Sequence, residues 1–147
     1  MYEGQTSGIK RSLVPEDQRS KIVADLFGLH WPLRIEPYIY AMTDQMAASY
    51  HGGYWQFYTL KIPGEGSPGF YMAPDSEETY EVRCQGNFFD GVLSADALGI
   101  TACLCTYNRL SFSDNQGFGQ LMAMYYHRLK AYMLEHAEAP AIRGAID

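Results

Sequence analysis

The chain has 147 residues, of which 47% are hydrophobic and 19% charged, and its net charge is −6. This length and composition are typical of one folded domain with its own core and exclude a disordered chain. Seventeen acidic residues against 11 basic ones argue against direct nucleic-acid binding, which relies on cationic contacts to phosphates. No apolar run reaches the roughly 20 residues of a membrane helix, so no membrane contact is expected.

The first third of the chain predicts a short arm followed by two helices. Residues 1–13 lack periodicity and are expected to form a flexible N-terminal arm, with a single domain over residues 14–147. A proline at a first helical position and a following glycine predict a helix over Pro15–Phe27. After two prolines interrupt the chain, apolar residues at helical spacing predict a second helix over residues 38–49.

The middle of the chain changes to the alternating pattern of β-strands. Residues 54–62, rich in aromatic and β-branched residues, and residues 80–85 show this alternation. Residues 70–73 and 88–93 are predicted to be two further short strands. Their short connections favour antiparallel pairing, because parallel strands need a long crossover. Of the neighbouring Phe70 and Tyr71, one is expected to face the core and the other to face outward.

The last third is predicted to be helical again. Ser94 is a plausible N-cap and Asp96 a first-turn acid for a helix that continues to Cys105 and is apolar on nearly every side, as a buried helix is. A final helix is expected over residues 118–136, and a tail over residues 137–147 that lies against the body through Ile142 and Ile146. The fold class is therefore α+β: a small antiparallel sheet of about four strands packed with about four helices in a single domain.

No catalytic, metal or cofactor motif is visible in the sequence. The four histidines show neither H-E-x-x-H nor zinc-finger spacing, and no glycine-rich phosphate loop or G-x-S-x-G elbow occurs, so we predict no metal and no cofactor. Cys103 and Cys105 point to different sides of a helix and, like Cys84, are expected to be reduced thiols of a cytoplasmic protein. This pattern favours a binding protein over an enzyme.

Five sequence blocks spread over nearly the whole chain carry a family resemblance. They are LVP at 13–15, GGYWQFY at 52–58, GFYMAPD at 69–75, LSADALGITA at 93–102 and EHAEAPAIRGAID at 135–147. Together they resemble the ArdB/KlcA family of antirestriction proteins. The resemblance implies a cytoplasmic protein of a mobile genetic element that inhibits type I restriction-modification enzymes and so protects unmodified incoming DNA. Its partner would be the type I restriction endonuclease complex or a host factor acting on that complex.

The candidate partner-binding residues lie mostly in segments expected to be exposed loops, since loops carry recognition on rigid scaffolds. We predict contact through the turn at 63–69, the stretch Asp75–Thr79, the first turn of the buried helix and the end of the tail. The candidates are Asp75, Glu77, Glu78, Asp96 and Asp147.

Two alternatives stay open at this point. The protein could be an enzyme that modifies or inactivates the restriction complex, using Ser94, Asp96 or a histidine. It could also be a DNA mimic, although the acidic residues are scattered singly or in pairs rather than in runs. The leading interpretation is inhibition by protein contact, without catalysis and without DNA mimicry.

Overall fold

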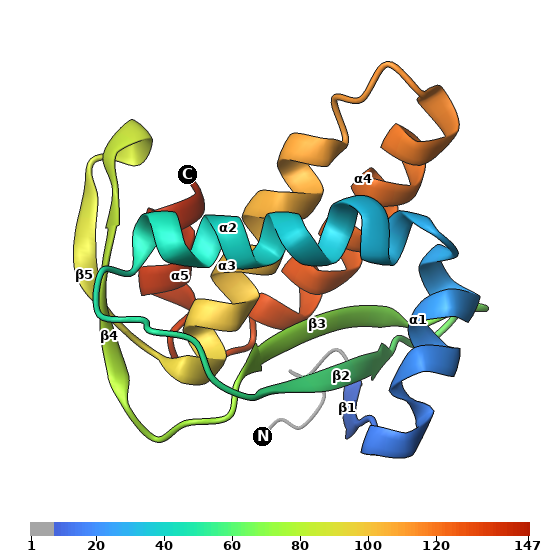
Figure 1. Cartoon of the computed structure of the whole chain (residues 1–147), viewed down its shortest axis with the longest axis horizontal. Coiled ribbons are helices and arrows are strands. Elements are labelled where there is room, and N and C mark those ends of the chain that lie inside the picture. The colour runs from blue at the N-terminus through green and yellow to red at the C-terminus, as the bar shows by residue number, and fades with distance from the viewer. Residues whose placement is uncertain (1–7) are drawn as a thin grey trace.

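The structure is a computed structural model that describes residues 8–147, and it confirms the α+β class. Its helices and strands follow one another as β1 (Lys10–Leu13), α1 (Arg19–Phe27), α2 (Glu36–Met46), β2 (Trp55–Lys61), β3 (Gly69–Pro74), β4 (Thr79–Cys84), β5 (Phe89–Ser94), α3 (Ala95–Leu110), α4 (Gln116–Met133) and α5 (Ala139–Ile146). Figure 1 shows β1, β2 and β3 along one side of the helices, with β4 and β5 standing at one end.

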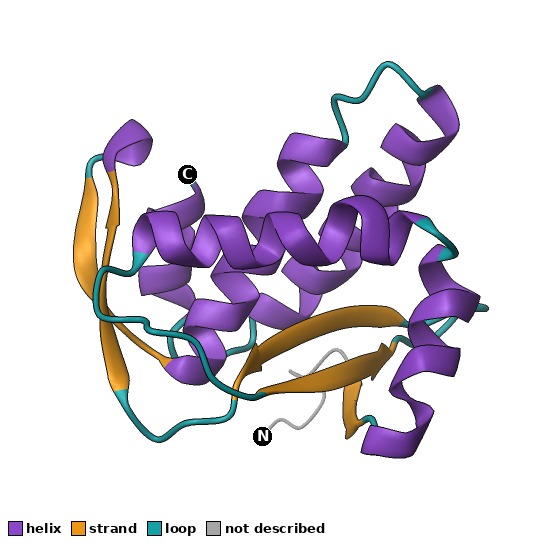
Figure 2. Cartoon of the chain, in the orientation of Figure 1, coloured by secondary structure: helices purple, strands orange, loops and turns teal. Residues whose placement is uncertain are grey.

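The strands form two antiparallel sheets in place of the single sheet expected from the sequence. The first has the order β1-β2-β3, and the second is the hairpin of β4 and β5 (Figure 2). The outer edge of β3 is not free to pair with β4, because α3 packs along it. The Tyr107 hydroxyl donates to the carbonyl of Phe70 at 2.8 Å, and the Cys103 thiol lies 3.7 Å from the carbonyl of Met72.

A glycine makes this close contact between α3 and β3 possible. A Cβ atom added at Gly99 would lie 2.4 Å from the carbonyl oxygen of Met72 and 2.4 Å from the Cβ of Ala73. No side chain can occupy that space unless the helix and the strand move apart. Gly99 therefore allows α3 to cover the β3 edge that would otherwise be open to pairing with another strand.

The prediction that residues 1–13 form a flexible arm is wrong for the last four of them. Lys10–Leu13 form β1, which pairs with β2 in the register Lys10↔Lys61 to Leu13↔Tyr58. Every side chain of β1 is exposed, so the sequence shows none of the half-buried alternation that would have predicted a strand. Residues 1–7 of the arm lie outside the described residues.

The second helix begins earlier than predicted. Trp31–Ile35 form a π-helical turn that runs directly into α2, and the chain passes through both Pro32 and Pro37. Each proline occupies the first or second position of its segment, where proline is tolerated, and the Glu36 amide just before Pro37 still bonds to the Trp31 carbonyl, so neither proline interrupts the chain. The helix ends at Met46, three residues before the predicted end.

The core is centred on a cluster of aromatic rings and on α3. Trp31 packs against Phe27, Phe57 and Phe70 with ring centroids 5.2–5.7 Å apart. Twelve of the 16 residues of α3 are buried, which confirms the prediction of a buried helix. The C-terminal tail lies against the body as expected, through the fully buried Ile142 of α5 and the partly buried Ile146.

Candidate functional site

The structure places three of the five predicted site residues in one exposed loop and separates the others from it. Asp75, Glu77 and Glu78 are exposed in the segment between β3 and β4. Asp147 is exposed at the end of α5, well away from this loop in Figure 1. Asp96 lies in the first turn of α3, and its side chain is 30% exposed. The five acids therefore do not form one continuous patch.

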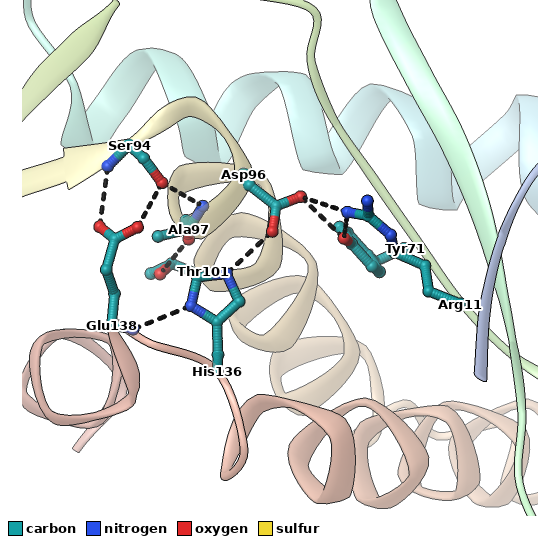
Figure 3. Close-up of polar contacts among 8 residues, drawn as sticks. All are labelled: Arg11, Tyr71, Ser94, Asp96, Ala97, Thr101, His136 and Glu138. Atoms are coloured by element: carbon teal, nitrogen blue, oxygen red, sulfur yellow. Dashed lines mark hydrogen bonds and ion pairs between the residues drawn. The ribbon is translucent and has the colours of Figure 1, made fainter. Parts of the chain in front are cut away.

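Asp96 is the centre of a polar cluster drawn from three distant parts of the chain (Figure 3). Its Oδ1 accepts a hydrogen bond from the Tyr71 hydroxyl at 2.7 Å and lies 3.4 Å from the guanidinium of Arg11. Its Oδ2 lies 2.9 Å from Nε2 of His136. The carboxylate thus connects β1, β3 and the segment that follows α4 to the start of α3.

The electrostatics of this cluster favour a charged Asp96. Burial alone would raise the pKa of the carboxyl group, but the hydrogen bonds from His136 and Tyr71 and the charge of Arg11 outweigh it and lower the pKa. Burial, followed by the negative charge of Asp96, raises the pKa of the Tyr71 hydroxyl, which stays protonated and donates.

The hydrogen bonds of His136 fix the position of its proton. Nδ1 accepts from the backbone N–H of Glu138 at 3.0 Å, so the neutral ring carries its hydrogen on Nε2 and donates it to Asp96. Both ring nitrogens of His136 therefore form hydrogen bonds within the chain. The ring joins the first turn of α3 to the segment that leads into α5.

Ser94 is the N-cap of α3, as the sequence predicts. Its hydroxyl oxygen accepts from the backbone N–H of Ala97 at 3.1 Å, and the hydroxyl donates to the Glu138 carboxylate at 2.5 Å. Glu138 also accepts from the backbone N–H of Ser94 at 3.0 Å. The Ser94 hydroxyl is therefore engaged on both sides, and its partners do not include His136.

Stacked tyrosines cover the Asp96 cluster on the side of β2. Tyr71 stacks on Tyr58 and on Tyr132 with ring centroids 4.9 and 5.8 Å away, and Arg11 lies 4.4 Å from the centre of the Tyr58 ring. The expectation that one of Phe70 and Tyr71 faces outward is wrong, because both are fully buried. Their side chains do point to opposite faces, but the tyrosine stack covers the second face as well.

Sequence reasoning identified Ser94 and Asp96 in this cluster and missed the other members. Arg11 lies in the segment predicted to be a flexible arm, and Tyr71 is 25 residues from Asp96. His136 is 40 residues from Asp96. No spacing rule links residues so far apart. The one available signal was that several of the residues fall within the family-like sequence blocks.

The described part of the chain offers no other arrangement typical of chemistry. Within residues 8–147, no three His, Cys, Asp or Glu side chains are grouped closely enough to hold a metal ion. Over the same residues, no helix is long and apolar enough to cross a membrane. Cys103 is fully buried, as expected of a core residue, and burial raises its pKa to about 12.

The fold and the cluster define the class of protein: a small α+β domain whose N-terminal strand and C-terminal segment are both tied to the start of one buried helix. Comparison with known proteins then gives the family. The family model described as antirestriction protein matches residues 48–147, and the chain belongs to this family.

Relatives and a solved structure agree over nearly the full length. Antirestriction protein KlcA of Escherichia coli is 39% identical over 145 residues, covering 96% of this chain and 95% of the relative. A second Escherichia coli KlcA is 38% identical over 145 residues, covering 97% and 98%. A solved structure from work on the KlcA and ArdB proteins is 36% identical, covers 100% of both chains and has a TM-score of 0.85. That work describes a novel fold and antirestriction activity against type I DNA restriction systems in vivo but not in vitro.

Proposed function

We propose that this protein relieves type I restriction in the cell by contacting a protein, without catalysis and without imitating DNA. The observation that carries the proposal is the full-length likeness to a solved structure from work that describes antirestriction activity of the KlcA and ArdB proteins against type I systems in vivo. The expected consequence is protection of unmodified incoming DNA. A protein with this role works inside the cytoplasm.

The acidic segment between β3 and β4 is the proposed contact surface. Asp75, Glu77 and Glu78 are exposed, and none of them forms an ion pair with another residue of the described chain. Backbone hydrogen bonds hold the segment in shape, from Asp75 N–H to the Tyr54 carbonyl at 2.8 Å and from Glu78 N–H to the Ser76 hydroxyl at 2.9 Å. A shaped loop with three free carboxylates suits a partner surface with a basic patch.

The other candidate residues contribute less to this surface. Both oxygens of Asp96 already have partners within the chain, so we assign it the role of fixing the start of α3. The turn at 63–69 is tied to α4, because Arg128 bonds Glu65 at 2.9 Å and the Ser67 hydroxyl at 2.8 Å. Asp147 is a separate, secondary candidate.

The charge distribution supports a route other than DNA mimicry. A mimic needs carboxylates at the density of a duplex, which has one phosphate per ~1.7 Å of helix axis. Here exposed acids are interspersed with bases, as in the ion pairs Lys21–Asp25 at 2.7 Å and Arg83–Asp90 at 3.3 Å. Such a mixed surface does not present an unbroken line of negative charge.

The geometry of the Asp96 cluster argues against the enzyme alternative. A serine nucleophile needs a base within hydrogen-bond reach. Ser94 bonds Glu138 and a backbone amide, while His136 bonds Asp96. Serine and histidine are therefore directed to different carboxylates, and the cluster fits a structural connection better than a catalytic triad.

The contrast between activity in vivo and its absence in vitro bears on the partner. It was observed for the KlcA and ArdB proteins and fits a requirement for a cellular component that a purified assay lacks. The partner we propose is accordingly the type I restriction complex in its cellular setting or a host factor acting on it. Pull-down from a restricting strain, with the wild type and the loop variant below in parallel, would separate these two.

The test is the plating efficiency of unmodified phage on a strain with a type I restriction system. Expression of the wild-type chain should raise plating, and the loop variant Asp75→Asn/Glu77→Gln/Glu78→Gln should lose most of that gain. The matched control is Asp44→Asn/Glu81→Gln/Asp114→Asn, which removes the same charge from three exposed acids elsewhere. Equal protection by both triple variants would refute the assignment of the loop, and no protection by the wild type would refute the function.

A second pair of variants tests the enzyme alternative. Ser94→Ala and His136→Asn should leave protection in place, provided circular dichroism shows that each variant is folded at the assay temperature. Complete loss of protection by both folded variants would instead favour catalysis by this cluster.

A further inference from the structure

A cavity of about 560 Å³ lies between α2, α3, the tip of the β4–β5 hairpin and the end of α5. Figure 1 shows these elements gathered near the C-terminus, away from the β3–β4 loop. The volume falls within the range of small-molecule binding sites, which is roughly 300–1,000 Å³. Neither the Asp96 cluster nor the proposed contact loop contributes to its walls.

Part of the cavity wall is apolar and adaptable. The partly buried Met42, Tyr126 and Ile146 provide its accessible apolar surface, and Met46, which is 4% exposed, adds a second thioether to the lining. Methionine side chains are flexible and polarisable, so they adjust to ligands of different shape. Such a wall can accommodate the apolar body of a ligand.

The mouth of the cavity is cationic, in a chain whose net charge is −6. Arg83 and Arg109 belong to the lining, whereas no aspartate or glutamate does. Arg83 is partly neutralised by Asp90 at 3.3 Å, in an exposed ion pair of little strength. Arg109 forms no ion pair within residues 8–147 and stands beside the exposed amide of Asn108.

Arg109 also has a simpler explanation that the experiment must separate. It lies in the last turn of α3, where a cation interacts favourably with the helix dipole. That role requires neither the cavity nor its apolar wall. A ligand role requires both, and it predicts that charge and apolar area act together in binding.

We propose that this cavity binds a small amphipathic anion. The apolar body of the ligand lies on Met42, Tyr126 and Ile146, and its carboxylate or phosphate group accepts hydrogen bonds from Arg109 and Asn108. Arg83, which also lines the cavity, adds positive charge. This binding is separate from the proposed function and can be measured whether or not the protein relieves restriction.

The test is a ¹⁵N–¹H NMR titration of the full chain with decanoate and decyl phosphate, each below its micelle concentration, and with decanol below its solubility limit. Decanoate or decyl phosphate should cause saturable shifts at the amides of Met46, Leu104 and Asn108. Comparison of the two identifies the preferred acid group. Decanol, which has the same chain without the charge, should bind at least about tenfold more weakly, since charge-assisted hydrogen bonds are stronger than neutral ones.

Variants connect binding to the cavity. Arg109→Gln should weaken anion binding about tenfold, whereas Arg143→Gln, which removes an exposed arginine of α5 outside the cavity, should leave it unchanged. Asn108→Trp places an indole in the mouth at an exposed position and should abolish the shifts while the thermal unfolding curve stays cooperative.

Four results would overturn the proposal. The first is the absence of saturable shifts with both anions. The second is shifts spread over the exposed apolar residues Leu29, Leu33 and Phe112, which would indicate non-specific adsorption. The third is decanol binding as tightly as the anions. The fourth is unchanged affinity in Arg109→Gln, which would leave the helix dipole as the role of this arginine.

Discussion

Replacement of Gly99 by alanine tests the contact between α3 and β3 most directly. The new Cβ would lie 2.4 Å from the Met72 carbonyl oxygen, whereas ordinary contacts begin at 3.4 Å, so helix and strand must separate by 3.4 − 2.4 = 1.0 Å. The same shift would lengthen the bond from Tyr107 to Phe70, now 2.8 Å, beyond hydrogen-bonding distance. The atoms in the way are the carbonyl oxygen of Met72 and the Cα and Cβ of Ala73, which belong to a paired strand and cannot rotate aside.

The expected change in the free energy of unfolding combines two destabilising effects and one stabilising effect. Overpacking costs about 1–3 kcal/mol, and the loss of one buried hydrogen bond costs about 1–3 kcal/mol. Alanine regains about 1 kcal/mol over glycine through helix propensity. We therefore expect Gly99→Ala to lower the free energy of unfolding by between about 1 and 5 kcal/mol, centred near 3.

Urea unfolding followed by far-UV circular dichroism measures this change. Gly117→Ala in the first turn of α4 is the matched control, because its Cβ would lie 3.6 Å from the nearest atom, an ordinary contact. The control should be unchanged or more stable by up to about 1 kcal/mol. If Gly99→Ala proves as stable as the wild type while the control behaves as stated, the close approach of α3 to β3 is wrong.

Three further predictions concern the Asp96 cluster. Tyr71→Phe should cost about 1–2 kcal/mol of unfolding free energy in urea, because it removes the hydroxyl between Asp96 and Arg11; no loss would contradict that bond. The pKa of Asp96 is lowered in the folded state, so its stabilisation is present above its ordinary value of 3.8 and is lost as pH falls through the folded value. Asp96→Asn should flatten the stability profile in that acidic range, and an unaltered slope would exclude the effect. Glu138→Gln should lower the free energy of unfolding less than Glu138→Ala, because glutamine retains acceptor capacity for Ser94. It should also speed amide exchange in α5. Equal exchange in the wild type and both variants would refute the anchoring role of Glu138.

Local signals were reliable where the structure depends on neighbouring residues. Ser94 was predicted as a helix cap because capping involves an amide three residues away. The buried character of α3 followed from apolar residues on all its sides. The division of the strands into two sheets could not be predicted, because it depends on α3 occupying the edge of β3, a contact between segments 31 and 37 residues apart.

In the candidate site, too, the sequence revealed what depends on neighbouring residues and not the contacts between distant ones. Asp96 was identified from its position in a first helical turn, but its partners come from residues 25, 40 and 85 positions away. The sequence therefore suggested that this carboxylate was available to a partner, and the structure shows both oxygens occupied within the chain. Arg11 was missed because β1 is exposed on every residue and has no pattern of its own.

The sequence by itself determined the α+β class, the buried helix and its cap, and the family resemblance that led to antirestriction. These properties depend on composition, periodicity and short-range hydrogen bonds, which are readable along the chain. Only the tertiary structure decided which acids are free and which are engaged. Asp75, Glu77 and Glu78 are exposed in one loop, whereas Asp96 is hydrogen-bonded to residues of other segments. The reason is that a carboxylate bonds to whichever donors the fold brings within about 3 Å.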